Sequence, residues 1–210
     1  MATVDVPAVT GAGLYVAPNG VYADVEGVEL WDEARDARLY AGPHPVVAHP
    51  PCARWCRFAG LVEARWGYPR GQDGGEFEAA LNAVRRYGGV LEHPAYSDAW
   101  AAYALPRPTV REGWTLDLFG GASCYVEQGR YGHPAKKATW LYAYGVVLRD
   151  LRWGYRRDGY PELVSWCGNH VNFWHEGRTR VGKAQAAATP PAFRDELLAI
   201  ARTAVLQSPP

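Results

Sequence analysis

Cys52 follows two prolines in the stretch AHPPC (48–52), directly after a short apolar run. Proline restricts the backbone, so the thiol is held with few degrees of freedom at the end of an expected buried strand. A nucleophilic cysteine needs this restraint, because its thiolate must be aimed at one atom of a substrate. The alternative is an ordinary buried cysteine, which behaves as a small apolar side chain.

Glu92 ends a second apolar stretch, VLEHP (90–94). Burial raises the pKa of a carboxyl group, so a buried Glu92 would donate a proton near neutral pH. The competing interpretation is a carboxylate that caps a helix or forms a salt bridge.

A metal site is a rival use of the same turn. His49, Cys52 and Cys56 follow one another at spacings of three and four residues, and His93 ends the next apolar stretch. Four such nitrogen and sulfur ligands suit a tetrahedral zinc ion, and ligation would remove Cys52 as a free nucleophile. This alternative predicts a zinc-binding enzyme that acts on nucleobases or nucleotides.

The elements around these residues predict an α/β fold. An amphipathic helix is expected over 74–89, because Phe77, Ala80, Leu81 and Val84 share one face and two glycines follow. It lies between strand-like runs at 45–49 and 90–94, which is typical of a βαβ unit. We therefore predict a three-layer, Rossmann-like fold, with a mainly parallel sheet and helices on both faces. Since ligands collect at the carboxyl ends of such strands, Cys52 and Glu92 are expected on one rim.

Further elements are expected along the chain. Strands are predicted at 13–17 and 27–31, a short helix at 32–40, two strands within 122–147 and a helix over 189–205 capped by Thr189. The predicted organisation is a flexible arm (1–13), an α/β catalytic core (14–149), a small loop-rich lobe (150–188) and a C-terminal helix that packs on the core (189–210).

Composition restricts the class of protein. The chain of 210 residues has 22 basic and 22 acidic side chains, which argues against binding to nucleic acid through bulk positive charge. No stretch is long and apolar enough to span a membrane, and no leader opens the chain, so we expect a cytoplasmic protein of a bacterial or phage-infected cell. Its four cysteines are then expected to be reduced. The oligomeric state is left open.

Several segments in this order resemble the C5-cytosine DNA methyltransferase family. They are Pro51-Cys52 after an apolar strand, Glu92-His93-Pro94 at the next strand end, and the segment YGHPAKK (131–137) before an apolar run. The closing segment ATPPAFRDELLAIA (188–201) is similar to the one that ends those enzymes. The glycine-rich cofactor loop of the family is missing, so the chain resembles a reduced, phage-type relative.

The resemblance implies chemistry on a cytosine flipped out of DNA. Cys52 would add to C6 of the ring, Glu92 would protonate or hydrogen-bond N3, and C5 would accept a methyl group from S-adenosylmethionine. The segments that would contact the substrate contain Pro51, His93, His133, Lys136 and Lys137, the two lysines standing where the family has arginines. Glu29 or Asp32 would bind the ribose hydroxyls of the cofactor.

A third interpretation is a nucleic-acid-binding relative without catalysis. The side chains of Trp153, Trp166 and Trp174, with nearby arginines, could stack on bases. The expected partner is DNA or a nucleotide substrate in every case.

Overall fold

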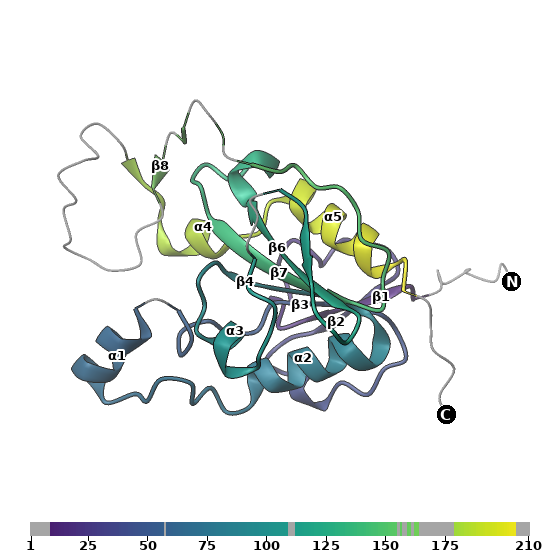
Figure 1. Cartoon of the computed structure of the whole chain (residues 1–210), viewed down its shortest axis with the longest axis horizontal. Helices are drawn as coiled ribbons and strands as arrows, with labels where there is room; N and C mark the ends of the chain where they lie inside the picture. The colour runs from purple at the N-terminus through teal and green to yellow at the C-terminus, as the bar shows by residue number, and fades with distance from the viewer. Residues whose placement is uncertain are drawn as a thin grey trace, which may run out of the picture.

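The structure is a computed structural model that describes residues 9–56, 58–108, 112–154, 156, 159–160, 162–163 and 179–204. A seven-stranded sheet runs in the order β2-β1-β3-β4-β7-β6-β5 (Figure 1). Its strands are β1 (Gly11–Leu14), β2 (Val28–Trp31), β3 (Val46–Ala48), β4 (Gly89–Pro94), β5 (Trp114–Leu116), β6 (Gly121–Glu127) and β7 (Ala138–Tyr144). A separate pair consists of β8 (Glu162–Leu163) and β9 (Thr179–Arg180).

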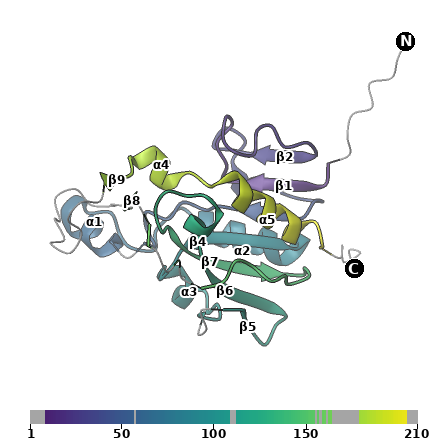
Figure 2. The same cartoon turned by 90° about the horizontal axis from the view of Figure 1, so that it is seen from above.

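The helices are placed around this sheet and at one end of it. They are α1 (Ala59–Trp66), α2 (Glu76–Tyr87), α3 (Ala99–Ala102), α4 (Lys183–Ala187) and α5 (Pro191–Ala201), with single 3₁₀ turns η1 (Ala37–Leu39) and η2 (Gln128–Tyr131). Figure 2 shows α1 and α4 toward one end of the sheet.

The prediction of a three-layer, Rossmann-like fold with a mainly parallel sheet is wrong. The pairs β2–β1, β1–β3 and β3–β4 are parallel, whereas β4–β7, β7–β6 and β6–β5 are antiparallel. The physical reason is the short connection between β6 and β7, which holds one 3₁₀ turn and no crossover helix. Parallel neighbours need a long crossover, so these strands pair as an antiparallel ribbon.

The local βαβ prediction is confirmed within this mixed sheet. β3 and β4 pair in parallel, and α2 lies between them in sequence with Phe77, Ala80, Leu81 and Val84 buried. Alternate strand residues face opposite sides, so Leu91 packs with α2 while Val90 packs with α5. In Figure 1, α2 and α5 accordingly lie on opposite sides of the sheet.

Three smaller expectations differ from the structure. The segment 32–40 forms only the turn η1, because Asp36 has a positive φ of 52° and interrupts any longer helix. The buried strand β1 begins at Gly11, inside the predicted arm. Pro190, not Thr189, occupies the N-cap position of α5.

Candidate functional site

A pocket of about 630 Å³ lies at the carboxyl ends of β1, β3 and β4. Its wall is formed by the loop 15–22, the turn 49–52, Glu92 and Pro94 at the end of β4, Lys137 before β7, and residues 184–189 around α4. Cys52 and Glu92 therefore line one cavity. The volume is in the range of small-molecule sites in proteins.

Cys52 sits in a compact turn that follows β3. The N–H groups of Trp55 and Cys56 donate to its carbonyl oxygen at 3.0 and 2.8 Å, and His49 before it donates its N–H to the carbonyl of Leu14 at 3.0 Å. These bonds tie the turn to the end of β1. Burial, with smaller effects of Cys56 and Glu92, raises the pKa of the Cys52 thiol to about 12. Cys52 is therefore a thiol at neutral pH, and the charge of Lys137 acts in the opposite direction.

Glu92 is a buried carboxylate with two hydrogen-bond donors. His49 Nδ1 lies 2.9 Å from Oε2, and Gln128 Nε2 donates to Oε1 at 3.0 Å. Burial raises the pKa of Glu92, but the hydrogen bond from His49 and the charge of Lys137 outweigh it, so the pKa falls to about 2. The expectation of a raised pKa is therefore wrong. Glu92 is ionised at neutral pH and holds no proton to donate.

The His49 ring connects Glu92 to Tyr22. The Tyr22 hydroxyl oxygen lies 2.8 Å from His49 Nε2, and both side chains line the pocket. Burial raises the pKa of Tyr22 well above its ordinary value, so the hydroxyl keeps its proton. With the Tyr22 O–H donating to Nε2, Nδ1–H donates to Glu92, and each polar atom of the chain has a partner.

Lys137 holds one wall of the pocket in place. Its Nζ donates to the carbonyl oxygens of Ala187 and Ala188 at 2.9 and 2.8 Å, and its φ is +38°. Burial lowers the pKa of Lys137, while the charges of Glu92 and Cys52 raise it. Lys137 thus connects the start of β7 to the end of α4 and places a cation near Cys52 and Glu92.

The other predicted substrate contacts divide into two groups. Pro51 lines the pocket, but Lys136 and His133 do not. Lys136 Nζ pairs with the buried Glu127 at 3.1 Å. The buried ring of His133 accepts from the N–H of Ala135 through Nδ1, and its Nε2 donates to the carbonyl of Gln185 at 3.0 Å. These two side chains support the site from outside.

His93 lies on the other face of the sheet from Glu92. The two residues are adjacent in β4, and successive strand side chains point to opposite faces. The His93 ring packs against Phe77 and Trp100, at centroid distances of 5.2 and 6.2 Å, and is fully buried. Burial lowers its pKa to about 4, against opposing effects of Glu92 and the Pro51 backbone. It does not reach the pocket.

The predicted zinc ligands are not brought together. The His49 ring bonds Glu92 in the pocket, whereas the His93 ring packs against Phe77, and Cys56 Sγ lies 3.9 Å from the carbonyl oxygen of Ala53. Within the described part of the chain, no three His, Cys, Asp or Glu side chains form a group that could hold a metal ion.

The predicted cofactor contacts do not fit this pocket either. Glu29 pairs with Arg35 at 2.8 Å, and Asp32 Oδ1 accepts from the backbone N–H of Arg35 at 3.0 Å. Neither carboxylate lines the pocket, so neither is placed to bind a ribose that lies there.

The tryptophans proposed as a stacking surface are described only in part. The Trp153 ring packs against Trp114 at a centroid distance of 6.2 Å, and its Nε1 lies 3.5 Å from Asp150. Trp166 and Trp174 lie outside the described residues.

Sequence reasoning missed Tyr22 and Gln128. Tyr22 belongs to the loop after β1, where no periodic pattern marks it. Gln128 follows Glu127 at the end of β6, and its Nε2 donates to both Glu92 and Thr139 at 3.0 Å. The sequence signal for Gln128 was the polar pair Glu127-Gln128 between two apolar strands. Polar groups at a buried strand end need hydrogen-bond partners, so such a pair indicates a polar network.

Comparisons with protein-family models, with curated proteins and with solved structures found no match to this chain. Among the described residues, no helix has the length and apolar character that a membrane span requires.

Proposed function

We propose that the protein modifies a pyrimidine base of nucleic acid through covalent addition of Cys52 to the ring. One observation carries the proposal: the Cys52 thiol and the hydrogen-bonded pair His49–Glu92 line the same pocket. A thiol beside a fixed carboxylate suits a flat heterocycle that is attacked at carbon while its ring N–H and amino groups are hydrogen-bonded. The base would enter the pocket after flipping out of a duplex or from a single strand.

The addition step needs only groups of this chain and the base. The Cys52 sulfur forms a bond to C6, and the C5=C6 double bond becomes a single bond as a proton is added at C5. The reverse elimination removes either hydrogen at C5 and releases the thiol. A cytosine that visits the site therefore exchanges its C5 hydrogen with water.

The charge states define how the step begins. Because the pKa of Cys52 is about 12, the thiol must lose its proton as the base binds, and Lys137 is the cation that favours the thiolate. Glu92, with a pKa of about 2, is an acceptor for the exocyclic amino group of cytosine or for a protonated N3.

Methyl transfer from S-adenosylmethionine is the second half of the proposal and rests on the resemblance to C5-cytosine methyltransferases. The acidic residues expected at the ribose, Glu29 and Asp32, are outside the pocket. The pocket geometry therefore supports the addition of Cys52 to the ring, whereas the sequence resemblance alone supports methyl transfer. The two steps are tested separately.

The test of addition is deuterium exchange at C5. The protein is incubated in deuterated water with one of three substrates: a cytosine-containing single-stranded oligonucleotide, the duplex formed by that strand and its complement, or deoxycytidine monophosphate. The nucleosides are then analysed by mass spectrometry. We expect exchange with an oligonucleotide and none with Cys52→Ser. The matched control is Cys56→Ser, since Cys56 lies one turn away and does not line the pocket. Exchange that survives in Cys52→Ser contradicts the proposal.

The test of methyl transfer is covalent trapping. Fluorine at C5 blocks the final elimination, so an oligonucleotide with 5-fluorocytosine should stay attached to Cys52 only after a methyl group has entered. We expect a stable adduct in the presence of S-adenosylmethionine. Deuterium exchange without any trapped adduct would retain the addition and reject this methyl donor.

A further inference from the structure

The proposed addition leaves open which group supplies a proton to the ring. Conjugate addition to C6 of cytosine places negative charge on N3, and a general acid at that atom speeds such a step by about 10²–10⁴-fold. Glu92 is the residue that the sequence suggests, yet its pKa of about 2 leaves it ionised. The acid must be another group of the pocket.

A chain of hydrogen bonds runs through the pocket wall beside Glu92. The Tyr22 hydroxyl lies 2.8 Å from His49 Nε2, His49 Nδ1 lies 2.9 Å from Glu92 Oε2, and Gln128 holds Glu92 Oε1 at 3.0 Å. Tyr22 is only 2% exposed, and its ring packs against the His49 ring at a centroid distance of 5.4 Å. The four side chains come from four segments and form one fixed unit.

We propose that Tyr22 and His49 are a proton relay that protonates N3 of the bound pyrimidine, with Glu92 as the residue that positions His49. This inference rests on the proposed function. In neutral His49, Nδ1–H donates to Glu92 and Nε2 accepts from the Tyr22 hydroxyl. When His49 takes up a proton, Nε2 becomes a donor, so the Tyr22 hydroxyl must turn and its hydrogen becomes available to the pocket.

The relay step is balanced as follows. The Cys52 thiolate forms the bond to C6, the C5=C6 electron pair moves between C4 and C5, and the C4=N3 pair moves onto N3. N3 takes the hydroxyl proton of Tyr22, and the Tyr22 oxygen takes the Nε2 proton of His49. The thiol proton leaves to water and His49 is recharged from water, so one proton passes from sulfur to N3.

The charged and titratable groups around the relay come from several elements. Glu92 faces His49 from β4, and Lys137 and Cys52 act on Glu92 from the start of β7 and from the turn. Arg194 and Asp195 of α5 act on Tyr22. His49 is the side chain that bonds both Tyr22 and Glu92.

The test compares the rate of C5 deuterium exchange against pH in two variants. His49→Asn keeps an amide N–H near the position of Nδ1 but cannot carry a proton. Tyr22→Phe keeps the ring and removes the hydroxyl. We expect each to lower the exchange rate by about 100-fold, with oligonucleotide affinity unchanged within about threefold. The exchange rate should stay low in His49→Asn at every pH tested, because asparagine cannot pass a proton to the Tyr22 hydroxyl. The matched control is His44→Asn, outside the pocket.

An activity-independent measurement separates the relay from the proposed function. Nuclear magnetic resonance of ¹⁵N-histidine-labelled protein should show the proton of the neutral His49 ring on Nδ1, and Tyr22→Phe should change the chemical shift of Nε2, because it removes the hydrogen bond to that atom. If wild-type protein exchanges no deuterium but His49 behaves in this way, the proposed base modification fails, whereas the hydrogen-bonded chain from Tyr22 through His49 to Glu92 is retained. A His49 protonated at Nε2 when neutral, or exchange that is unchanged in both variants, overturns the relay.

Discussion

Glu92 stays charged in a buried place because its neighbours offset the cost of burial. A carboxylate removed from water needs donors and opposite charge, and His49, Gln128 and Lys137 provide them. The same neighbours remove its use as an acid. At the scale of single residues, the surroundings of a side chain therefore decide its charge. The pKa values of Glu92 and His93 lead to two predictions.

Glu92→Gln should destabilise the protein at neutral pH but not in strong acid. The folded pKa of about 2 lies below the ordinary 4.5, so the carboxylate contributes about 3 kcal/mol above pH 4.5. This contribution is lost as the pH falls from 4.5 through 2. Urea unfolding of both proteins across that range measures it. A difference in unfolding free energy that does not change with pH would contradict this charge state.

His93→Phe should remove part of the acid sensitivity of the fold. The pKa of His93 falls from 6.5 to about 4 on folding, so the unfolded chain binds more protons between these values. Wild-type stability should therefore decrease by about 3 kcal/mol as the pH falls from 6.5 to 4. In His93→Phe this decrease should be missing, because phenylalanine keeps the contacts with Phe77 and Trp100 but cannot titrate.

Urea unfolding at pH 7.5, 5.5 and 4.5 measures the effect of His93→Phe. His44→Asn is the control, because it replaces a partly exposed histidine that lies before β3. An equal slope in wild-type protein and in His93→Phe would show that His93 is not the residue responsible.

At the scale of elements, the loop before β7 holds α4, which forms one wall of the pocket. His133 and Lys137 both bond to backbone carbonyls in and after α4, although 46 or more residues separate them in sequence from that helix. α4 has only five residues, which is too short to be stable alone. Its position therefore depends on these contacts.

Lys137→Met should loosen α4 and leave the sheet intact. Loss of two hydrogen bonds to Ala187 and Ala188 should raise amide hydrogen exchange in residues 184–190 by about tenfold. Mass spectrometry of peptic peptides measures it. Lys136→Met is the matched control, because the Lys136 Nζ pairs with Glu127 of β6. Equal protection of 184–190 in both variants would contradict the role of Lys137.

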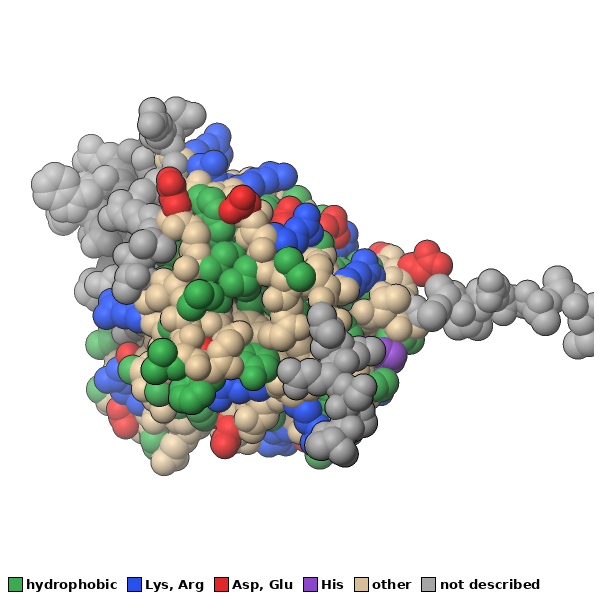
Figure 3. Space-filling model, turned by 45° about the vertical axis from the view of Figure 1, so that its right-hand side comes forward, with side chains coloured by type: hydrophobic (Ala, Val, Ile, Leu, Met, Phe, Trp, Pro, Cys, Tyr) green, Lys and Arg blue, Asp and Glu red, His purple; other side chains and the backbone are tan. Residues whose placement is uncertain are grey.

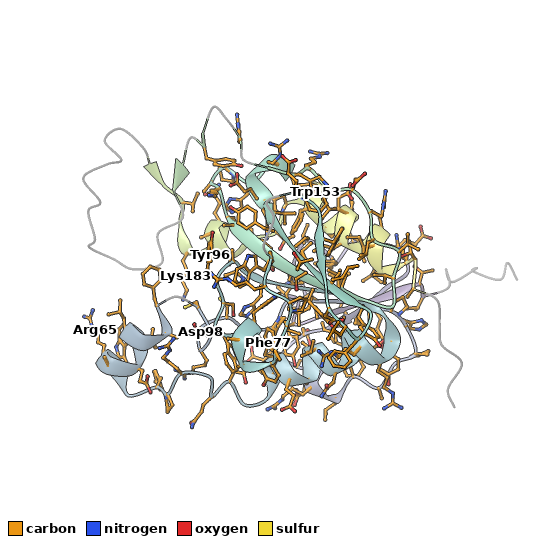
Figure 4. The ribbon with its side chains drawn as sticks, viewed as in Figure 1. Arg65, Phe77, Tyr96, Asp98, Trp153 and Lys183 are labelled. Atoms are coloured by element: carbon orange, nitrogen blue, oxygen red, sulfur yellow. The ribbon has the colours of Figure 1, made fainter. Side chains whose placement is uncertain are left out.

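At the scale of the whole molecule, the charges balance in number and are mixed on the face that Figure 3 shows. The chain has equal numbers of basic and acidic residues, and the face in Figure 3 shows both signs interspersed. Figure 4 shows the charged residues Arg65 at the outer part of α1 and Lys183 at the start of α4, both on the side of the molecule that carries these helices. On that face, a nucleic acid bound as we propose would meet separate cations.

Binding of an oligonucleotide should depend only weakly on salt. Each phosphate contact contributes about −0.9 to the slope of log K against log salt for duplex DNA, and a few separate cations predict a slope no steeper than about −3. Fluorescence anisotropy between 50 and 300 mM salt measures it. A slope near −8 would indicate a large basic surface and contradict this reading of the charge distribution.

The sequence by itself determined the elements whose patterns are local. The stripe of Phe77, Ala80, Leu81 and Val84 defines α2, and the apolar runs on either side define β3 and β4. Strand ends after such runs are also local, which is why Cys52 and Glu92 could be placed on one rim. These features follow from residue spacing, and the backbone geometry converts spacing directly into a buried face.

Only the tertiary structure decided the direction of β7 beside β4 and the charge state of Glu92. A period of two is the same in parallel and antiparallel strands, so nothing local distinguished β7 from a parallel neighbour of β4. The partners of Glu92 come from segments far apart in the chain, His49 after β3 and Gln128 after β6. A pKa depends on the distances between such groups, and those distances exist only once the chain has folded.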